Sequence, residues 1–235
     1  MNETVEHVVI IGGTSGIGLA SAKRLSSRGS LVTIVGRDST KLDAALRDIG
    51  GVARGEVADA TQRATLEDVF MRSKPIHHLV VSASGGAGAG PIGTMSAEGL
   101  RHGFEAKFWV YWNATHSVLP HLAENGSITF ITAASSRFAN PGTSGLAAIN
   151  GALERMVPTL ARELAPRRIN AISPGVIDTA WWANKPTGMF ESQSYKAPLG
   201  RAGRPDEVAD AVAFLIGNRF ITGIILDVDG GLHLT

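Results

Sequence analysis

The chain has 235 residues, of which 44% are hydrophobic, and its 22 basic and 21 acidic side chains leave a formal charge of +1. This length fits one α/β domain with a substantial core, and the balanced charge argues against a nucleic-acid or acidic-membrane surface. The absence of cysteine excludes disulfides, thiolate metal sites and Cys nucleophiles. No apolar run approaches the roughly 18 residues of a membrane span, and a glycine turn follows too early for a signal peptide. We expect a cytoplasmic protein that binds a small molecule, with no nucleic acid and no membrane as partner.

Short β-branched runs alternate with segments of helical period, which is typical of a parallel sheet covered on both faces. The runs predict strands at about residues 7–11, 31–36, 52–57, 77–82, 127–132, 168–173 and 223–228. One helix is predicted over about 97–121 from a cap at Ser96, and a later long helix contains Pro158, which should bend it without ending it. The predicted fold class is α/β: a single Rossmann-type, doubly wound domain over residues 1–235, with a seven-stranded parallel sheet.

A glycine-rich turn joins the first predicted strand to the first helix. Gly12, Gly16 and Gly18 stand in the stretch IIGGTSGIGLASAKRL. Glycines let the backbone approach a pyrophosphate, whose charge then meets the free amides at the start of the helix. A tight turn without a ligand is the alternative, and the flanking strand and helix favour the phosphate site.

The stretch GGTSGIG resembles the TGxxxGIG signature of the short-chain dehydrogenase/reductase family, with Ile11 in the place of the usual Thr. NAISPGVIDT and the C-terminal segment over 198–231 are similar to further parts of that family, so the resemblance covers nearly the whole chain. It implies a nicotinamide dinucleotide as cofactor and a homotetramer or homodimer built on the two long helices. The predicted cofactor contacts are Gly12, Thr14, Ser15, Gly16, Ile17, Gly18, Arg37, Asp59, Ala60, Ala83, Pro174, Gly175, Ile177 and Thr179.

The end of the second strand favours one form of the cofactor. Gly36 stands where an NAD site has an acidic residue, and Arg37 follows it. Since a guanidinium grips a phosphate in two places, NADP(H) is preferred over NAD(H). Two alternatives stay open, namely that Arg37 pairs with Asp38 in solvent and that Asp59 only caps the next helix.

The places at which this family carries its catalytic set hold other residues here. Ala133 takes the place of the Ser, and Leu146, thirteen residues later, takes that of the Tyr. Asn150 replaces the Lys, and Lys107 replaces the Asn of the preceding helix. Because Leu146 has no ionisable proton, the usual mechanism of the family cannot operate in this chain.

The Asn and Lys places are thus exchanged, which suggests a displaced proton donor. Our hypothesis is that Lys107, together with Tyr111 one turn further on, donates the proton or binds an anionic substrate. Asn150 would face the same cavity, and Ser135 and Thr132 would polarise a carbonyl. The alternative is that Lys107 is a structural residue in a site without catalysis and that Ser135 makes only a loop hydrogen bond.

Residues 180–197 correspond to the segment that covers the substrate in this family. Trp181 and Trp182 there favour an apolar or ring-containing ligand, whereas a subunit interface is the alternative. No metal site is expected, because His116 and His121 point to different faces of their predicted helix.

Two functions remain open at this level. The first is an NADP(H)-dependent oxidoreductase with a non-standard active site, which acts on a carbonyl, imine or activated alkene. The second is an NADP(H)-binding protein without turnover, either a sensor or a silent subunit. The cofactor motifs favour the first, and the four replaced catalytic places favour the second.

Overall fold

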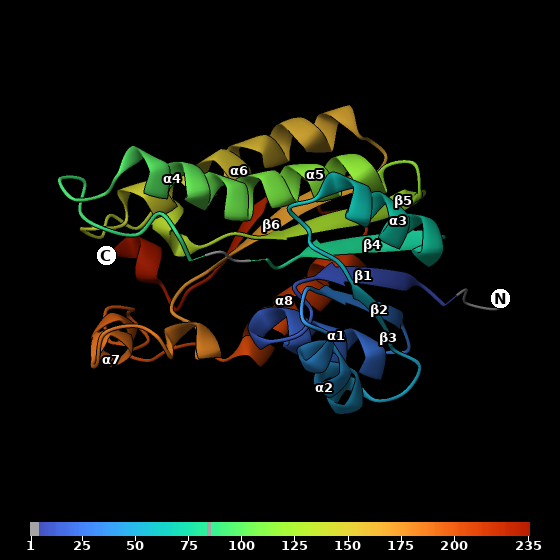
Figure 1. Ribbon diagram of the computed structural model, residues 1–235, viewed down its shortest axis with the longest axis horizontal. Helices are drawn as coiled ribbons and strands as arrows, with labels where there is room; N and C mark the ends of the chain where they lie inside the picture. Colours follow the sequence, from blue (N-terminus) through green and yellow to red (C-terminus); the bar gives the residue numbers. More distant parts are fainter. Residues whose placement is uncertain (1–4, 84–85) are drawn as a thin grey trace.

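The computed structural model of the chain describes residues 5–83 and 86–235. Its strands form one parallel sheet in the order β3-β2-β1-β4-β5-β6-β7 (Figure 1). They are β1 (His7–Ile11), β2 (Leu31–Gly36), β3 (Arg54–Val57), β4 (Ile76–Val81), β5 (Leu122–Ile131), β6 (Arg168–Pro174) and β7 (Ile225–Val228). The strand order reverses direction at β1 and β4, as in a doubly wound sheet. The predicted α/β fold with a seven-stranded parallel sheet is confirmed.

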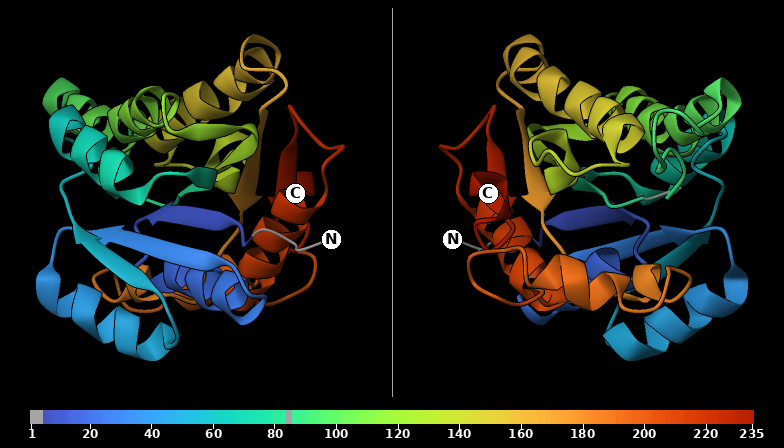
Figure 2. Two further views of the ribbon diagram at one scale, coloured as in Figure 1. Left: turned by 90° about the vertical axis from the view of Figure 1, so that its right-hand side faces the viewer. Right: turned by 90° about the vertical axis from the view of Figure 1, so that its left-hand side faces the viewer.

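Helices cover both faces of this sheet (Figures 1 and 2). One layer consists of α1 (Gly16–Ser27), α2 (Ser39–Ile49) and α8 (Pro205–Gly217). The other consists of α3 (Arg63–Ser73), α4 (Ala97–Gly103), the π-helical turn η1 (Phe104–Phe108), α5 (Trp109–Val118) and α6 (Ser144–Glu163). The short elements η2 (Ala134–Ser136), η3 (Ala180–Trp182), α7 (Met189–Ser194) and η4 (Leu232–Leu234) lie in connections or at the C-terminus.

Side chains of the central strands alternate between two apolar cores. Val8 and Ile10 of β1 pack with α1, α2 and α8, whereas Val9 and Ile11 pack with α3, α5 and α6. Because successive strand residues point to opposite faces, a strand with helices on both sides must be apolar throughout. This is why the β-branched runs were readable in the sequence.

The helix predicted over 97–121 differs from the observed one in two ways. It is interrupted by η1, and it ends at Val118. The end follows from Pro120, since proline has no backbone N–H with which to continue the helical hydrogen bonds. His121 therefore lies outside the helix and opens the connection to β5.

Strand β5 begins at Leu122 and not near residue 127. Leu122 pairs with Ile76 across a register irregularity, and Gly126 lies so close to β4 that a Cβ there would be 2.6 Å from the carbonyl oxygen of His77. The polar residues between these two points hid the first part of the strand from a reading of the apolar pattern.

Two other local predictions are confirmed: the cap at Ser96 and the continuation of the long helix through Pro158. The Ser96 side chain accepts a hydrogen bond of 3.0 Å from the Gly99 amide and so caps α4. Helix α6 continues through Pro158. No helix in the described part of the chain is both long and apolar enough to cross a membrane.

Candidate functional site

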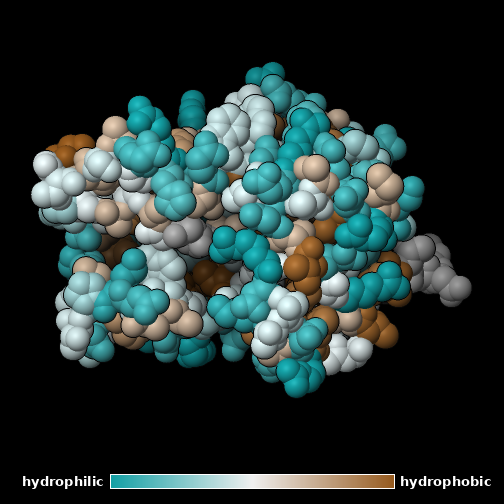
Figure 3. All heavy atoms as spheres, in the orientation of Figure 1, coloured by the Kyte–Doolittle hydropathy of each residue, from teal (hydrophilic) through white to brown (hydrophobic). Residues whose placement is uncertain are grey.

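The carboxyl ends of the parallel strands meet at one edge of the sheet, where open α/β folds bind ligands. In Figure 3 the surface is hollowed between the two helical layers at this end, and hydrophobic residues lie at the base of the hollow. The turn after β1, the loop that follows β4, and the segments after β5 and β6 all border this edge. Many of the predicted cofactor-binding and catalytic residues lie on these segments. Arg37, Asp59 and Ala60 instead follow β2 and β3. Lys107, Tyr111 and Asn150 lie on η1, α5 and α6.

The glycine turn forms a close-packed cradle. Gly12 has φ +80°, and a Cβ on Gly18 would lie 2.1 Å from the Gly12 carbonyl oxygen, which no side chain could tolerate. Helix α1 starts at Gly16, and among the described residues the Ser15 side chain does not cap it. The first-turn amides therefore have no acceptor within the helix. A pyrophosphate fits this arrangement, because it brings negative charge to the positive end of a helix.

The turn faces the segment after β6. A Cβ on Gly16 would lie 3.3 Å from the Thr179 methyl group. The Ile177 backbone pairs with Gly203 and accepts a hydrogen bond of 2.9 Å from the Trp182 indole. Gly175 packs so closely on the segment after β7 that its Cβ would be 2.7 Å from the Asp229 Cα atom. The structure thus brings the predicted glycine, PG and Thr179 positions to one cleft edge, with Pro174 as the last residue of β6.

The second and third strand ends lie beside this cradle. Gly36 allows Thr14 to approach, since its Cβ would be 2.5 Å from the Thr14 methyl group. Arg37 is exposed, and the Asp38 side chain caps α2 by accepting a 3.0 Å bond from the Lys41 amide. Within residues 5–83 and 86–235, no ion pair joins Arg37 to Asp38. The Arg37 side chain therefore lies exposed at the end of β2.

Asp59 is held in a local turn. Its carboxylate accepts hydrogen bonds of 3.0 Å from the Thr61 amide and 2.9 Å from the Thr61 hydroxyl. Helix α3 begins later, at Arg63. Ala60 and Ala83 pack against the core at the ends of β3 and β4.

Asn150 and Ser135, two of the predicted catalytic residues, contact one another. The Asn150 side-chain amide donates to the Ser135 hydroxyl at 3.2 Å and to the Leu146 carbonyl at 2.9 Å. Asn150 is only 2% exposed, and its side-chain oxygen has no donor among the described residues. A buried acceptor without a donor is costly. A hydroxyl group of a ligand in the cleft is one donor that would satisfy it.

Lys107 lies on the π turn η1, a kind of helix defect that is frequent at functional sites. Its ammonium donates to the Thr132 carbonyl at 3.2 Å, at the carboxyl end of β5. Burial lowers the pKa of Lys107 to about 8, and the charge of Glu154 opposes that fall. With this lowered pKa, the Lys107 ammonium can release a proton near neutral pH.

Tyr111 has no exposed surface from which to reach a ligand. Its hydroxyl is directed at the carbonyl oxygens of Ile131 and Ala83, and its ring packs on Phe130. Burial raises the pKa of Tyr111 above its ordinary value. The geometry gives Tyr111 a structural contact beside Lys107, whose ammonium lies 5.7 Å from the centre of the ring.

The structure adds Glu154, which the sequence interpretation missed. It is 8% exposed, and its carboxylate accepts hydrogen bonds of 2.8 Å from the hydroxyls of Thr132 and Ser136. The signal was present, because a Glu one turn after Asn150 stands next to the apolar face of α6. A lone acid on a helix is usually solvated, so the sequence alone did not single it out.

The aromatic residues of the covering segment form a cluster. The rings of Trp181 and Trp182 pack edge to face with their centres 4.8 Å apart, and the ring centres of Trp182 and Phe190 are 5.5 Å apart. The Lys185 ammonium lies 4.2 Å from the centre of the Trp181 ring. A Cβ on Gly86 would lie 3.3 Å from the Trp181 indole nitrogen, so Trp181 adjoins the loop after β4. The cluster therefore borders the cleft.

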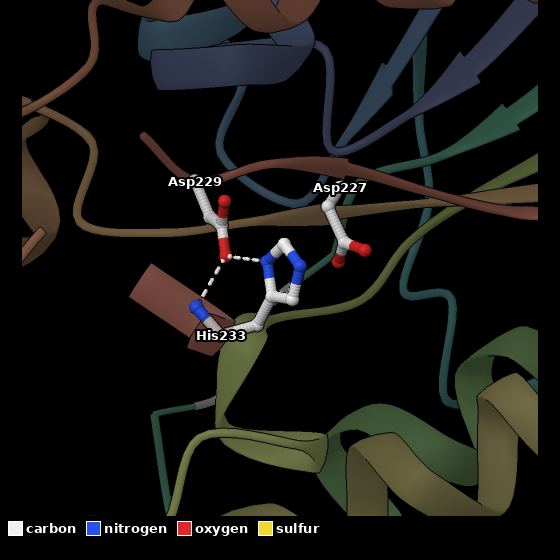
Figure 4. A group of neighbouring side chains, drawn as sticks. All are labelled: Asp227, Asp229 and His233. Carbon is white, nitrogen blue, oxygen red and sulfur yellow. Dashed lines mark hydrogen bonds and ion pairs between the residues drawn. The ribbon is translucent and has the colours of Figure 1, made fainter. Parts of the chain in front are cut away.

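Asp227, Asp229 and His233 lie together near the C-terminus, with ligand atoms within 4.8 Å of one another (Figure 4). Asp229 accepts hydrogen bonds from the Gly231 amide at 2.9 Å and from the His233 amide at 2.8 Å, and it contacts the His233 ring at 2.7 Å. Asp227 contacts the Arg137 guanidinium at 2.9 Å. All three side chains are thus engaged by the protein itself, and Asp229 holds the turn into η4.

Comparisons with known proteins agree with this geometry. The sequence model of a family described as enoyl-(acyl carrier protein) reductase matches residues 12–233. A short-chain dehydrogenase/reductase of Stachybotrys chlorohalonatus is 31% identical over 97% of each chain. The 4-formylbenzenesulfonate dehydrogenase of Comamonas testosteroni is 32% identical over the full length of both.

A solved structure gives the same result. A small-chain dehydrogenase in complex with NADPH superposes with a TM-score of 0.85 at 31% identity, covering 99% of this chain and 100% of the other. The likeness extends over the sheet, both helical layers and the glycine turn. The chain therefore belongs to the short-chain dehydrogenase/reductase family of oxidoreductases.

Proposed function

We propose that this protein is an NADP(H)-dependent oxidoreductase in which Lys107 takes the part of the missing tyrosine. The observation that carries this proposal is the position of Lys107: its ammonium lies at the carboxyl end of β5, 3.2 Å from the Thr132 carbonyl, on a π turn. The substrate would be a carbonyl, imine or activated alkene. We also infer that residues 1–235 form a single cofactor-binding domain, with 180–197 as the segment that covers the substrate.

The cofactor preference rests on the adenine side of the cleft. Arg37 follows the small Gly36 and is exposed at the end of β2, with Asp38 occupied as a helix cap. A guanidinium without a competing carboxylate suits a 2′-phosphate, and the solved relative that contains NADPH supports the same choice. Asp59 would lie at the adenine ring, and Ile177 and Thr179 at the nicotinamide.

In this mechanism the bound dinucleotide supplies the hydride. Lys107 supplies the proton: one Nζ–H bond breaks as a bond forms to the developing alkoxide, and the amine left behind regains a proton from water. A lysine with a pKa of about 8 suits this step, because it is charged at neutral pH and yet gives up its proton readily. Asn150 and Ser135 would hold the ribose and the carbonyl oxygen. The aromatic pair Trp181 and Trp182 would receive a ring of the substrate.

The proposal is tested by titrating the purified protein with NADPH and NADH, and then adding ketones, aldehydes and imines while nicotinamide fluorescence is followed. Aromatic aldehydes belong in the panel, since one relative is named for 4-formylbenzenesulfonate. We expect loss of the reduced signal with at least one compound, and a loss of turnover of at least about 100-fold in Lys107→Met. Lys41→Met, an exposed change on α2, is the matched control. Full turnover in Lys107→Met would refute the assigned role.

A second function is favoured by one observation. Leu146 is half-buried at the place of the family's tyrosine and can give no proton. If NADPH binds tightly and survives the whole panel, the protein is an NADP(H)-binding sensor or the silent partner of an active subunit. The same titration therefore separates the two functions.

We also infer a homodimer or homotetramer that packs on α5 and α6. Trp109 and Trp112 on α5 are 42% and 45% exposed, which is unusual for indole rings on a free surface. Light scattering should give the mass of two or four chains. Trp112→Glu should reduce it, and a monomeric parent protein would contradict the inference.

A further inference from the structure

Glu154 is a buried carboxylate that the proposed reaction does not use. Both hydroxyl donors, Thr132 and Ser136, lie on or next to the end of β5, and both bind the same oxygen at 2.8 Å. The other oxygen lies 3.5 Å from Nε of Arg137. Burying a carboxylate is costly even when it is compensated in this way. The arrangement therefore invites a functional explanation.

Glu154 contacts Thr132, one member of a polar row at the carboxyl end of the sheet. Ser173 of β6 is in register with Asp227 of β7, and the Thr132 amide donates to Ile172 of β6, which places Thr132 beside Ser173. Strand alternation directs all three side chains to the α6 face. Two residues earlier in each chain segment, on the same face of the sheet, the side chains are apolar: they are Phe130, Ala171 and Ile225. The polar residues are thus confined to the end of the sheet where Lys107 lies.

Arg137 forms a closer ion pair with Asp227 than with Glu154. Both terminal guanidinium nitrogens contact the Asp227 carboxylate, one of them at 2.9 Å, whereas the contact with Glu154 is longer. A two-point Arg–carboxylate pair is the stronger of the two arrangements. The charge of Glu154 is therefore left for the other cation of the cluster, Lys107.

Thr132 joins these two groups. Its carbonyl oxygen accepts from the Lys107 ammonium at 3.2 Å, and its hydroxyl donates to Glu154. The other charged groups nearby are directed elsewhere: Glu105 on the π turn and Arg155 on the outer side of α6 are exposed, and the Tyr111 hydroxyl is bound to backbone carbonyls. Among the described residues, Glu154 is the buried carboxylate that is linked to Lys107 through Thr132.

We propose that Glu154 is the positioning residue for the Lys107 ammonium, acting through Thr132, and that Asp227 assists by holding Arg137 away from Glu154. This rests on the proposed function, in which Lys107 donates the proton. Without Glu154, a larger fraction of the Lys107 amine would be neutral at neutral pH before a substrate arrived. The effect is a property of the free protein and can be measured without cofactor or substrate.

The test is an NMR titration of the side-chain amines in the full chain labelled with 13C and 15N lysine. The sequence has only six lysines, and Lys107→Met assigns the signal. We expect Glu154→Gln to lower the pKa of Lys107 by about one unit from its value of about 8, because a nearby anion is removed. Glu163→Gln, an exposed glutamate on the same helix, should leave it unchanged. An unchanged pKa of Lys107 in Glu154→Gln overturns the proposal.

A second variant covers the case in which Glu154→Gln does not fold, as judged by circular dichroism. Asp227→Asn releases Arg137 toward Glu154 and should lower the pKa of Lys107 by a smaller amount, and no change there overturns the proposal. The base limb of the pH–rate profile should move in the same direction in either variant. A shifted pKa without turnover would support the role of Glu154 and refute the proposed function. Turnover that depends on Lys107, together with an unshifted pKa of Lys107 in Glu154→Gln, would support the proposed function and overturn the role of Glu154.

Discussion

Replacing Lys107 by Met should stabilise the protein at neutral pH. Folding lowers the pKa of this lysine from 10.5 to about 8, chiefly by burial. That fall corresponds to about 3 kcal/mol of differential stability between the charged and neutral amine. Above about pH 10.5 the amine is neutral in the folded and unfolded states, and the free energy of unfolding has its full value. This stability is lost as pH falls from about 10.5 through about 8, because the unfolded state binds the proton more tightly. At neutral pH the parent protein therefore carries a cost that Lys107→Met removes.

The free energy of unfolding should be measured by denaturant titration of both proteins at about pH 7 and about pH 9. We expect Lys107→Met to be more stable by about 2 to 3 kcal/mol at the lower pH, since Glu154 loses its counterion and reduces the gain. The advantage should shrink by about 1.4 kcal/mol at the higher pH, because the parent lysine has by then released its proton. Lys41→Met, on the exposed face of α2, should show no such dependence. An advantage that stays constant between the two pH values would refute the lowered pKa and, with it, the use of Lys107 as an acid.

Three further predictions concern the cofactor cleft and the core. Gly18→Ala should abolish the fluorescence enhancement of bound NADPH and lower the melting temperature, since its Cβ would lie 2.1 Å from a backbone oxygen. The control Gly217→Ala places its Cβ in open space and should bind NADPH normally. Arg37→Ala should weaken NADPH about tenfold in a binding titration and leave NADH nearly unchanged; equal losses would show that the guanidinium contacts no 2′-phosphate. Arg168 is 6% exposed and donates to the last carbonyls of α8 at 2.7 and 2.9 Å, so Arg168→Met should lower the free energy of unfolding by about 3 kcal/mol. Arg162→Met, on the exposed face of α6, should stay within about 0.5 kcal/mol of the parent, and similar values for the two variants would contradict the capping role of Arg168.

The sheet and the glycine turn could be predicted because each is a local pattern. Buried parallel strands must be apolar on both faces, and a turn such as Gly12 to Gly18 must lack side chains where the backbone crosses itself. The same reasoning failed where a long-range contact decides the outcome. The first part of β5 pairs with Ile76 through a register irregularity, and no apolar run announces it. The π turn at Phe104–Phe108 was missed because the residues keep an ordinary helical spacing.

The catalytic places show a similar division. The spacing between Ala133 and Leu146 was enough to predict that the usual proton donor is missing. It could not decide what the replaced residues do. In the structure Asn150 donates a hydrogen bond to Ser135, whereas the buried Tyr111 donates to the Ile131 carbonyl. The sequence had predicted that Asn150 and Tyr111 would both lie in the cavity with Lys107.

Local sequence patterns were enough to predict the α/β fold, the order of the elements and the glycine turn, because hydrophobic periodicity and glycine geometry act over a few residues. The tertiary structure decided which charges meet. Glu154 lies 47 residues after Lys107, and Asp227 lies 90 after Arg137, so no local pattern could pair them. The close packing of α6 on β6 and η2 buries Glu154 in this cluster. In that low-dielectric setting, a single carboxylate can set the charge of a lysine.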